Sequence, residues 1–171
     1  DGQLITNLVW AKSTIKDNEI VADTENDILK VVVYNRYHAA KPKVGLIQSF
    51  GFKAGAIAST VAHDSHNIIA VGVDDESILK AINLVVHEKG GISCVQHELS
   101  KVIGLPVAGL MSTEDPYKVA NDYIEIDKMA KALGTKLGSP FMTLSFMALL
   151  VIPHIKMSDL GLFDGDQFKL Y

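Results

Sequence analysis

Short apolar runs alternate with polar turns through the first half of the chain, and this pattern predicts strands. Residues 28–34 are rich in β-branched and aromatic side chains, which is typical of a buried strand. Residues 44–52 predict a second strand in a hairpin with the first. Residues 55–62 and 68–72 flank a polar stretch, which indicates strand, tight loop and strand. The small side chains of residues 55–62 predict that another element packs closely against them.

A helical pattern follows, with apolar residues at helical spacing over positions 78–86. Asp74 or Asp75 is expected to cap its N-terminus, because an aspartate side chain accepts hydrogen bonds from the free N–H groups of a first turn. Gly90 and Gly91 are expected to end the helix.

Two more helices are predicted in the second half of the chain. One is expected to begin with Thr113 as its N-cap, to hold Pro116 in its first turn and to close at Gly134. Residues 141–150 are almost wholly apolar and predict a short buried helix stopped by Pro153.

The remaining runs predict shorter elements. Residues 4–10 predict a strand, residues 92–96 and 101–105 a hairpin, and residues 157–171 a polar, turn-rich tail. Strand runs mixed with two or three helices predict an α+β fold. We expect a mixed, largely antiparallel sheet with those helices packed on it.

Composition favours a single domain. The chain has 171 residues, 48% of them hydrophobic, which is enough for a sizeable core, and its one cysteine excludes an internal disulfide framework. We therefore expect one domain over residues 1–171, with residues 1–26 as a poorly anchored N-terminal segment.

Charge and hydropathy exclude several classes of partner. The chain has 16 Lys and Arg against 20 Asp and Glu, a formal charge of −4. This balance argues against nucleic acid or an anionic membrane, because both reward clustered basic residues. No apolar run approaches the ~20 residues of a membrane span. Asp1-Gly2-Gln3 opens no signal peptide, so we expect a cytoplasmic protein.

One polar cluster interrupts two apolar strands: His63, Asp64, Ser65, His66 and Asn67. Burying such groups is costly unless they are paired, so the loop is either solvated or used. One interpretation is a substrate-contacting loop, or a metal site in which His63 and His66 are accessory ligands. The alternative is a turn whose Asp, Ser and Asn side chains cap their own backbone. Two histidines and one carboxylate are too few to decide.

Few other residues suggest chemistry. The sequence has no Walker phosphate-binding loop, CxxC pair or HExxH motif. Arg36 follows the strand of residues 28–34 and either holds an anion or forms a surface ion pair. Cys94 lies in an apolar strand pattern and is expected to be inert core.

Longer matches relate the chain to a known family. Residues 51–72 form a 22-residue run similar to one in the C-terminal domain of adenine deaminases. Shorter blocks match in the family's order at residues 27–33 with 35–36, 105–112, 140–146 and 151–153. The chain therefore resembles the C-terminal domain of adenine deaminases, which belong to the amidohydrolase superfamily.

The resemblance implies that the parent protein hydrolyses adenine to hypoxanthine and ammonia, in purine salvage. In this superfamily a metal-activated hydroxide attacks the ring carbon, and the metals lie in a (β/α)8 barrel. A binuclear divalent centre of Mn, Fe or Zn is implied there, with adenine as the substrate. The resemblance also favours the interpretation that the polar cluster has a function over the interpretation that it is only a turn. The substrate-loop candidates are His63, Asp64, Ser65, His66 and Asn67, and the secondary candidates are Arg36 and Ser112.

The length of the chain departs from that of the family's enzymes. A (β/α)8 barrel needs about 250 residues, and this chain has 171 without the alternation of eight strands and helices. We therefore expect no barrel, no catalytic residue and no firmly bound metal here, and we expect the isolated chain to be inactive. The sequence also departs from the family's pattern at residues 38–43, 45–50 and 137–140, but these departures do not affect the match at residues 63–67.

Two hypotheses remain. In the first, the chain is a domain of an adenine deaminase that docks on the catalytic barrel and supplies the polar loop to its active site. In the alternative, it is a non-catalytic purine-binding or oligomerisation module of the same family, so self-association stays open. An exposed apolar patch where a barrel would dock would favour the first hypothesis.

Overall fold

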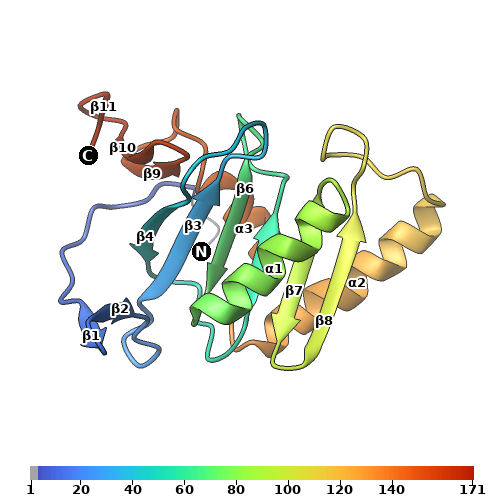
Figure 1. Cartoon of the computed structure of the whole chain (residues 1–171), viewed down its shortest axis with the longest axis horizontal. Coiled ribbons are helices and arrows are strands. Elements are labelled where there is room, and N and C mark those ends of the chain that lie inside the picture. Colours follow the sequence, from blue (N-terminus) through green and yellow to red (C-terminus); the bar gives the residue numbers. More distant parts are fainter. Residues whose placement is uncertain (1–3) are drawn as a thin grey trace.

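A six-stranded antiparallel sheet forms the centre of the computed structural model, which describes residues 4–171 (Figure 1). The strand order is β4-β3-β6-β5-β7-β8. The strands are β3 (Leu29–Tyr34), β4 (Lys43–Ile47), β5 (Ala56–Ser59), β6 (Ile68–Gly72), β7 (Gly91–Gln96) and β8 (Leu99–Gly104). Asp1, Gly2 and Gln3 lie outside the described residues, so the predicted N-terminal segment is seen only from Leu4 onwards.

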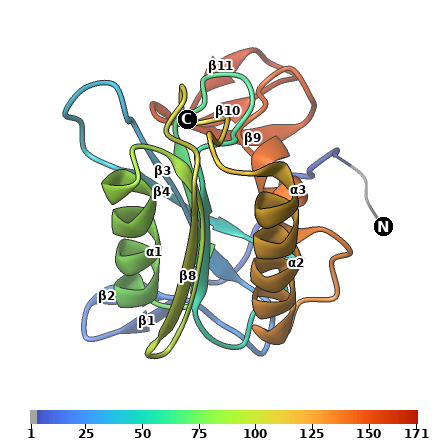
Figure 2. The same cartoon turned by 90° about the vertical axis from the view of Figure 1, so that its right-hand side faces the viewer.

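Helices cover both faces of this sheet. Helix α1 (Asp75–His87) lies on one face, and α2 (Pro116–Ala132) and α3 (Pro140–Phe146) lie on the other, as Figure 2 shows with the sheet seen edge-on. The predicted α+β class, with a largely antiparallel sheet and three helices, is confirmed. Residues 4–171 contain no (β/α)8 barrel. They also contain no helix that is long and apolar enough to cross a membrane.

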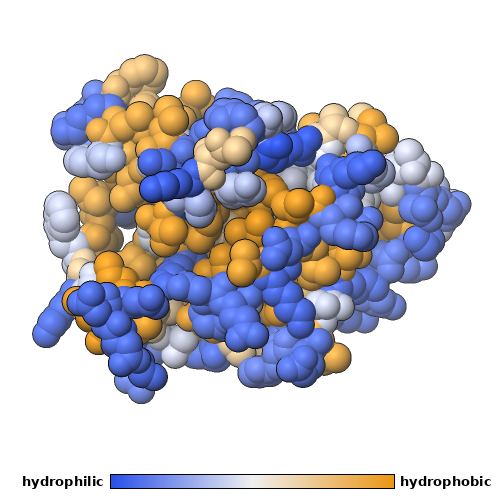
Figure 3. Space-filling view, in the orientation of Figure 1, coloured by the Kyte–Doolittle hydropathy of each residue, from blue (hydrophilic) through white to orange (hydrophobic). Residues whose placement is uncertain are grey.

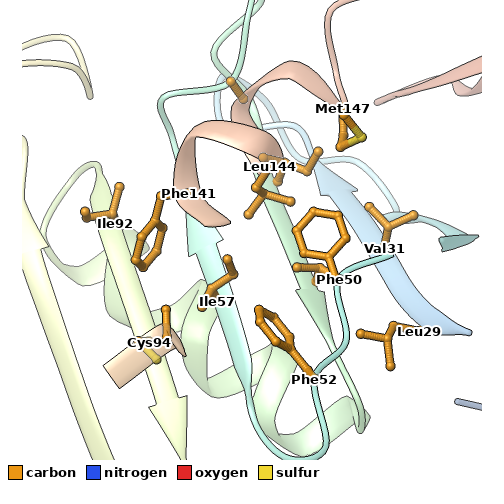
Figure 4. Close-up of a cluster of buried hydrophobic side chains, with 14 of the residues drawn as sticks. Leu29, Val31, Phe50, Phe52, Ile57, Ile92, Cys94, Phe141, Leu144 and Met147 are labelled. Atoms are coloured by element: carbon orange, nitrogen blue, oxygen red, sulfur yellow. The ribbon is translucent and has the colours of Figure 1, made fainter. Parts of the chain in front are cut away.

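Alternation along the strands divides the core into two layers. Leu29, Val31 and Val33 of β3 point toward α2 and α3, whereas Val32, between the two valines, points toward α1. The larger layer, on the α2 and α3 side, is built from aliphatic and aromatic side chains around Phe50 and Phe141 (Figure 4). Because both faces of the central strands are buried, polar groups of the inner strands can reach solvent only at the strand ends.

Small side chains face α1, as predicted for residues 55–62. Ala56 and Ala58 of β5 and Ala70 of β6 are completely buried beneath it. The helix contributes Ala81 at the contact, so its backbone approaches the sheet closely. The hydroxyl of Ser93 on β7 donates to the Ala81 carbonyl at 2.7 Å, which satisfies a fully buried polar group.

Helix boundaries follow the capping chemistry, with one correction. Asp74 caps α1 as predicted, because its carboxylate accepts from the Ser77 N–H at 2.7 Å. The prediction that Thr113 caps α2 was wrong. Asp115 caps it, accepting from the Tyr117 and Lys118 N–H groups, and Pro116 then occupies the first helical position.

Four other predicted segments differ in the structure. Residues 4–10 form no strand and make a single bridge, Thr6 to His154. The strand predicted over residues 44–52 ends at Ile47. The helix predicted over residues 141–150 ends at Phe146, because residues 147–152 turn back. The tail, predicted to be turn-rich, forms a three-stranded sheet of β9 (Ile155–Ser158), β10 (Gly161–Asp164) and β11 (Lys169–Leu170).

The N-terminal part of the chain is held by this tail. A hairpin of β1 (Thr14–Lys16) and β2 (Glu19–Val21) precedes β3. Thr6 exchanges backbone hydrogen bonds with Pro153 and His154. Lys156 on β9 is buried, with 2% of its surface exposed, and its Nζ donates to the Leu4 carbonyl. Burial lowers the pKa of Lys156 to about 8.

This buried amine predicts a pH-dependent stability. Between pH 8 and 9 the folded state releases the Lys156 proton, whereas the unfolded chain, with a lysine pKa near 10.4, retains it. The free energy of unfolding should therefore rise by about 1 kcal/mol relative to a Lys156→Met variant over this interval. Burial raises the pKa of Cys94 to about 12, so ionisation of this thiol in the unfolded chain lowers the free energy of unfolding as the pH rises. This effect is the same in the wild type and in Lys156→Met and cancels from their comparison.

Urea unfolding at pH 8 and pH 9 measures the difference. Lys128→Met, on an exposed position of α2, serves as the matched control and should behave like the wild type. A Lys156→Met protein that gains as much stability as the wild type over this interval would show that the buried amine is not responsible.

Candidate functional site

Loops from several elements meet at one end of the central sheet (Figure 1). Tyr34, at the end of β3, pairs with Ile68 at the start of β6, and Gly91 pairs with Gly104. Ser59, at the end of β5, pairs with Ile69 and Ile92. The polar loop, which we define as residues 63–67, therefore lies at the same end as the segments that follow β3 and β8. These segments carry the two secondary candidates.

Backbone hydrogen bonds fix the polar loop at both ends. The His66 N–H donates to the Ala62 carbonyl at 2.7 Å, which closes the turn. The His63 N–H donates to the Ser145 carbonyl in α3 at 3.1 Å. The loop is thus tied to the helix layer on the α2 and α3 side, a link that the sequence pattern did not reveal.

Asn67 holds the loop to the segment after β3. Its side chain is buried, with Oδ1 accepting from the Arg36 N–H at 3.2 Å and Nδ2 donating to Ser65 Oγ at 3.2 Å. The Tyr37 hydroxyl donates to the Ser65 carbonyl at 2.7 Å. Asn67 therefore joins the loop to the segment after β3, whereas the capping interpretation expected its side chain to bond the loop's own backbone.

The two histidines of the loop lie side by side. Their ring centroids are 5.7 Å apart in an edge-on arrangement, and the His63 ring lies 5.1 Å from that of Phe146. Nδ1 of His66 is buried without a hydrogen-bond partner among the described residues. Both rings are partly exposed, so they present an imidazole surface beside the exposed residues Asp64 and Ser65.

Asp64 is the least constrained member of the loop. It is exposed, and its carboxylate has no hydrogen bond or ion pair with any side chain or backbone group of residues 4–171. An ionised carboxylate accepts up to four hydrogen bonds and donates none. The loop thus presents a free carboxylate on a backbone that its neighbours hold in place.

The residues present do not fit a metal centre. Within residues 4–171 no three His, Cys, Asp or Glu side chains lie close enough together to hold a metal ion. The structure brings His63 and His66 together but adds no third ligand from the described part of the chain. Two imidazoles alone fall short of the three or four protein ligands typical of zinc sites.

Arg36 is fixed against the loop that follows β8. Its Nη2 donates to the Ala108 carbonyl at 2.9 Å, and its guanidinium lies 5.1 Å from the centre of the Tyr37 ring. A Cβ on Gly109 would lie 1.5 Å from Nη1 of Arg36, so only glycine leaves room for this packing. Gly109 also has a φ of +75°, which glycine adopts without strain. The surface ion pair considered for Arg36 does not form with the described residues.

Thr60 is a structural residue of this site that the sequence analysis missed. Its buried hydroxyl accepts from the Gly91 N–H at 2.8 Å and donates to the Gly109 carbonyl at 2.6 Å. It therefore joins the start of β7 to the loop after β8. Ser112 has a local role, since its Oγ accepts from the Glu114 N–H at 3.1 Å, and it forms no hydrogen bond with the polar loop.

Comparison with known proteins relates the whole chain to one family. Residues 3–169 match the family model described as adenine deaminase C-terminal domain. The chain belongs to this family. A relative from Sulfurovum sp., named adenine deaminase, is 52% identical over 160 residues, which is 91% of this chain. Relatives of the same name from Methanothermobacter thermautotrophicus and Borreliella burgdorferi are each 45% identical, over 99% and 97% of this chain.

The adenine deaminase C-terminal domain is only a part of these relatives. The chain spans 30%, 32% and 31% of the length of the Sulfurovum, Methanothermobacter and Borreliella proteins. The family resemblance inferred from residues 51–72 and the shorter blocks is thus confirmed. The roles of the individual loop residues stay predictions.

The contacts of Asn67 predict its contribution to stability. Asn67→Ala leaves the Arg36 N–H and the Ser65 hydroxyl without their partner, so the free energy of unfolding should fall by about 1–3 kcal/mol. Asn83→Ala, at an exposed position of α1, is the matched control and should change it by less than about 0.5 kcal/mol. Urea denaturation measures both variants, and equal stabilities would contradict the assigned role.

Proposed function

We propose that this chain is the domain of an adenine deaminase that presents the polar loop to the active site of a catalytic barrel. The observation that carries the proposal is the free carboxylate of Asp64 on a loop fixed by Asn67 and by α3. A solvated turn needs no such fixation, whereas a substrate contact requires a group held in one place.

The chemistry of adenine suits this loop. Adenine carries an exocyclic amine that donates hydrogen bonds and ring nitrogens that accept them. The Asp64 carboxylate accepts from the amine, and the hydroxyl of Ser65 and the imidazoles of His63 and His66 donate to the unprotonated ring nitrogens or accept from the ring N–H. Asn67 positions the loop and makes no contact with the base in this proposal.

Hydrolysis itself belongs to the barrel of the parent enzyme in this account. We assign the divalent metal of the family, manganese, iron or zinc, to that barrel; within residues 4–171 no three His, Cys, Asp or Glu side chains lie close enough together to hold a metal ion. The side chains of the polar loop bind and orient the base. The proposed setting is purine salvage in the cytoplasm, and the chain alone is proposed to be inactive.

An exposed apolar segment supports docking on a larger partner. Leu8, Val9 and Trp10 follow one another near the N-terminus, with exposed fractions of 46%, 61% and 90%. Contiguous apolar surface of this kind marks an interaction site more often than a free surface. The relatives are about three times as long as the chain, and we propose that their remaining part, the catalytic barrel, covers this segment.

The proposal predicts a kinetic defect in a full-length relative. Asp64→Asn, made at the aligned position, replaces the charged acceptor with a neutral amide of the same shape. The value of kcat/KM for adenine should fall about tenfold or more, as expected for the loss of one hydrogen bond to a charged group of about 1.5–3 kcal/mol. Steady-state ammonia release measures it.

A matched acidic residue lies at the opposite end of the sheet. Glu98 is exposed in the turn between β7 and β8, and Glu98→Gln should leave kcat/KM unchanged. If Asp64→Asn deaminates adenine as fast as the wild type, the loop does not contact the substrate. The non-catalytic module would then be the better account of this chain.

A further inference from the structure

A pocket of about 500 Å³ opens beside the polar loop, on the α1 side of the sheet. Its walls come from the end of β3 and the segment that follows it, from Thr60 before the polar loop, and from the C-terminal turn of α1. Pockets for small organic molecules have volumes of about 300–1,000 Å³. The pocket is thus large enough for a ligand with one or two rings.

The charged side chains that line this pocket are all basic or imidazole groups. Arg36, His38 and Lys89 line it, and no aspartate or glutamate does. Neither Arg36 nor Lys89 forms an ion pair within residues 4–171. Nη1 of Arg36 is buried against Gly109, also without a hydrogen-bond partner in the same part of the chain. In a protein with a formal charge of −4, two unneutralised cations on one concave surface favour an anion there.

The rest of the lining is aromatic and aliphatic. Tyr34 and Tyr37 stand on the β3 side, and Ile68, Val85 and Val86 provide apolar surface. Figure 3 shows this face of the molecule, where apolar surface beside α1 is bordered by hydrophilic side chains at the loop end. An aromatic and aliphatic wall next to cations suits a flat ring that carries a negative group.

The end of α1 does not oppose an anion strongly. A helix C-terminus carries partial negative charge on its free carbonyl groups. Here the carbonyls of Leu84, Val85 and Val86 accept hydrogen bonds from the N–H groups of residues 88–90. These carbonyls therefore do not face the pocket as free acceptors.

We propose that this pocket binds a small organic phosphate with a flat ring, of the nucleoside monophosphate class. Arg36 and Lys89 bind the phosphate, and the tyrosines and aliphatic side chains contact the ring. The site is separate from the proposed contact between the polar loop and adenine and does not depend on it. The two sites are neighbours, because Arg36 bonds to Asn67 and Thr60 precedes the loop.

Isothermal titration of the 171-residue chain tests the proposal with AMP, adenosine and inorganic phosphate as separate probes. AMP should bind at least about tenfold more tightly than either fragment, because each fragment makes only half of the contacts. Higher salt should weaken AMP binding, since the pocket is partly open to solvent. Amide NMR shifts on titration should be centred on Tyr37 and Gly90.

Lys89→Met provides the decisive variant. Lys89 is exposed, and its side chain forms no hydrogen bond or ion pair with the described residues, so its replacement should not disturb the fold. AMP affinity should fall about tenfold, as for the loss of one charge-assisted contact, while adenosine affinity stays the same. Lys128→Met, on the opposite face, is the matched control and should bind AMP as the wild type does.

Three results would overturn the proposal: no AMP binding, AMP binding no tighter than adenosine, or equal AMP binding by Lys89→Met and the wild type. An Asp64→Asn chain separates this site from the proposed active-site loop. It should keep full AMP affinity, and a loss there would place the nucleotide at the polar loop instead.

Discussion

The burial of β5 and β6 on both faces is the constraint on which the site depends. Ala58 and Ala70 lie beneath α1, and Ile57 and Ile69 lie beneath the opposite helices. A polar side chain within these strands would be desolvated and would need a hydrogen-bond partner inside the protein. The polar cluster is therefore confined to the turn between them, where the strand ends bring it to the same edge as the segments after β3 and β8.

Within this turn, the groups that hold the loop in place differ from the group that is free to bind a ligand. Asn67, Tyr37 and the backbone of Ser145 hold the loop. Thr60, which precedes it, joins the start of β7 to the loop after β8. The carboxylate of Asp64 has no partner in the described structure. Rigid support around a free acceptor is the arrangement expected of a group that orients a ligand, because the cost of ordering it is met on folding.

Much of the fold could be predicted from the sequence, where local rules and burial agree. The strands β3, β5 and β6 and the hairpin of β7 and β8 followed from period and composition, and Asp74 capped α1 as expected. The predictions failed where tertiary contacts decide. Residues 4–10 have the composition of a strand but pair with no strand, and their one bridge joins Thr6 to His154. Asp115, rather than Thr113, caps α2 because Pro116 fixes the first helical position.

The candidate loop was visible as an excess of polar residues, but its supports were not. The link from His63 to Ser145 joins residues far apart in sequence, and the packing of Arg36 on Gly109 depends on the loop after β8. Such contacts leave no pattern in the local sequence from which they could be predicted. The division of the loop between Asn67, which is structural, and Asp64, which is free, therefore emerged only from the structure.

A crystal structure of a full-length relative with an unreactive adenine analogue would test the central claim most directly. The account predicts that the carboxylate aligned with Asp64 lies about 2.7–3.2 Å from a hydrogen-bonding atom of the base. It would be contradicted if the base were enclosed by the other domains alone, with that carboxylate beyond the reach of a direct or water-bridged contact.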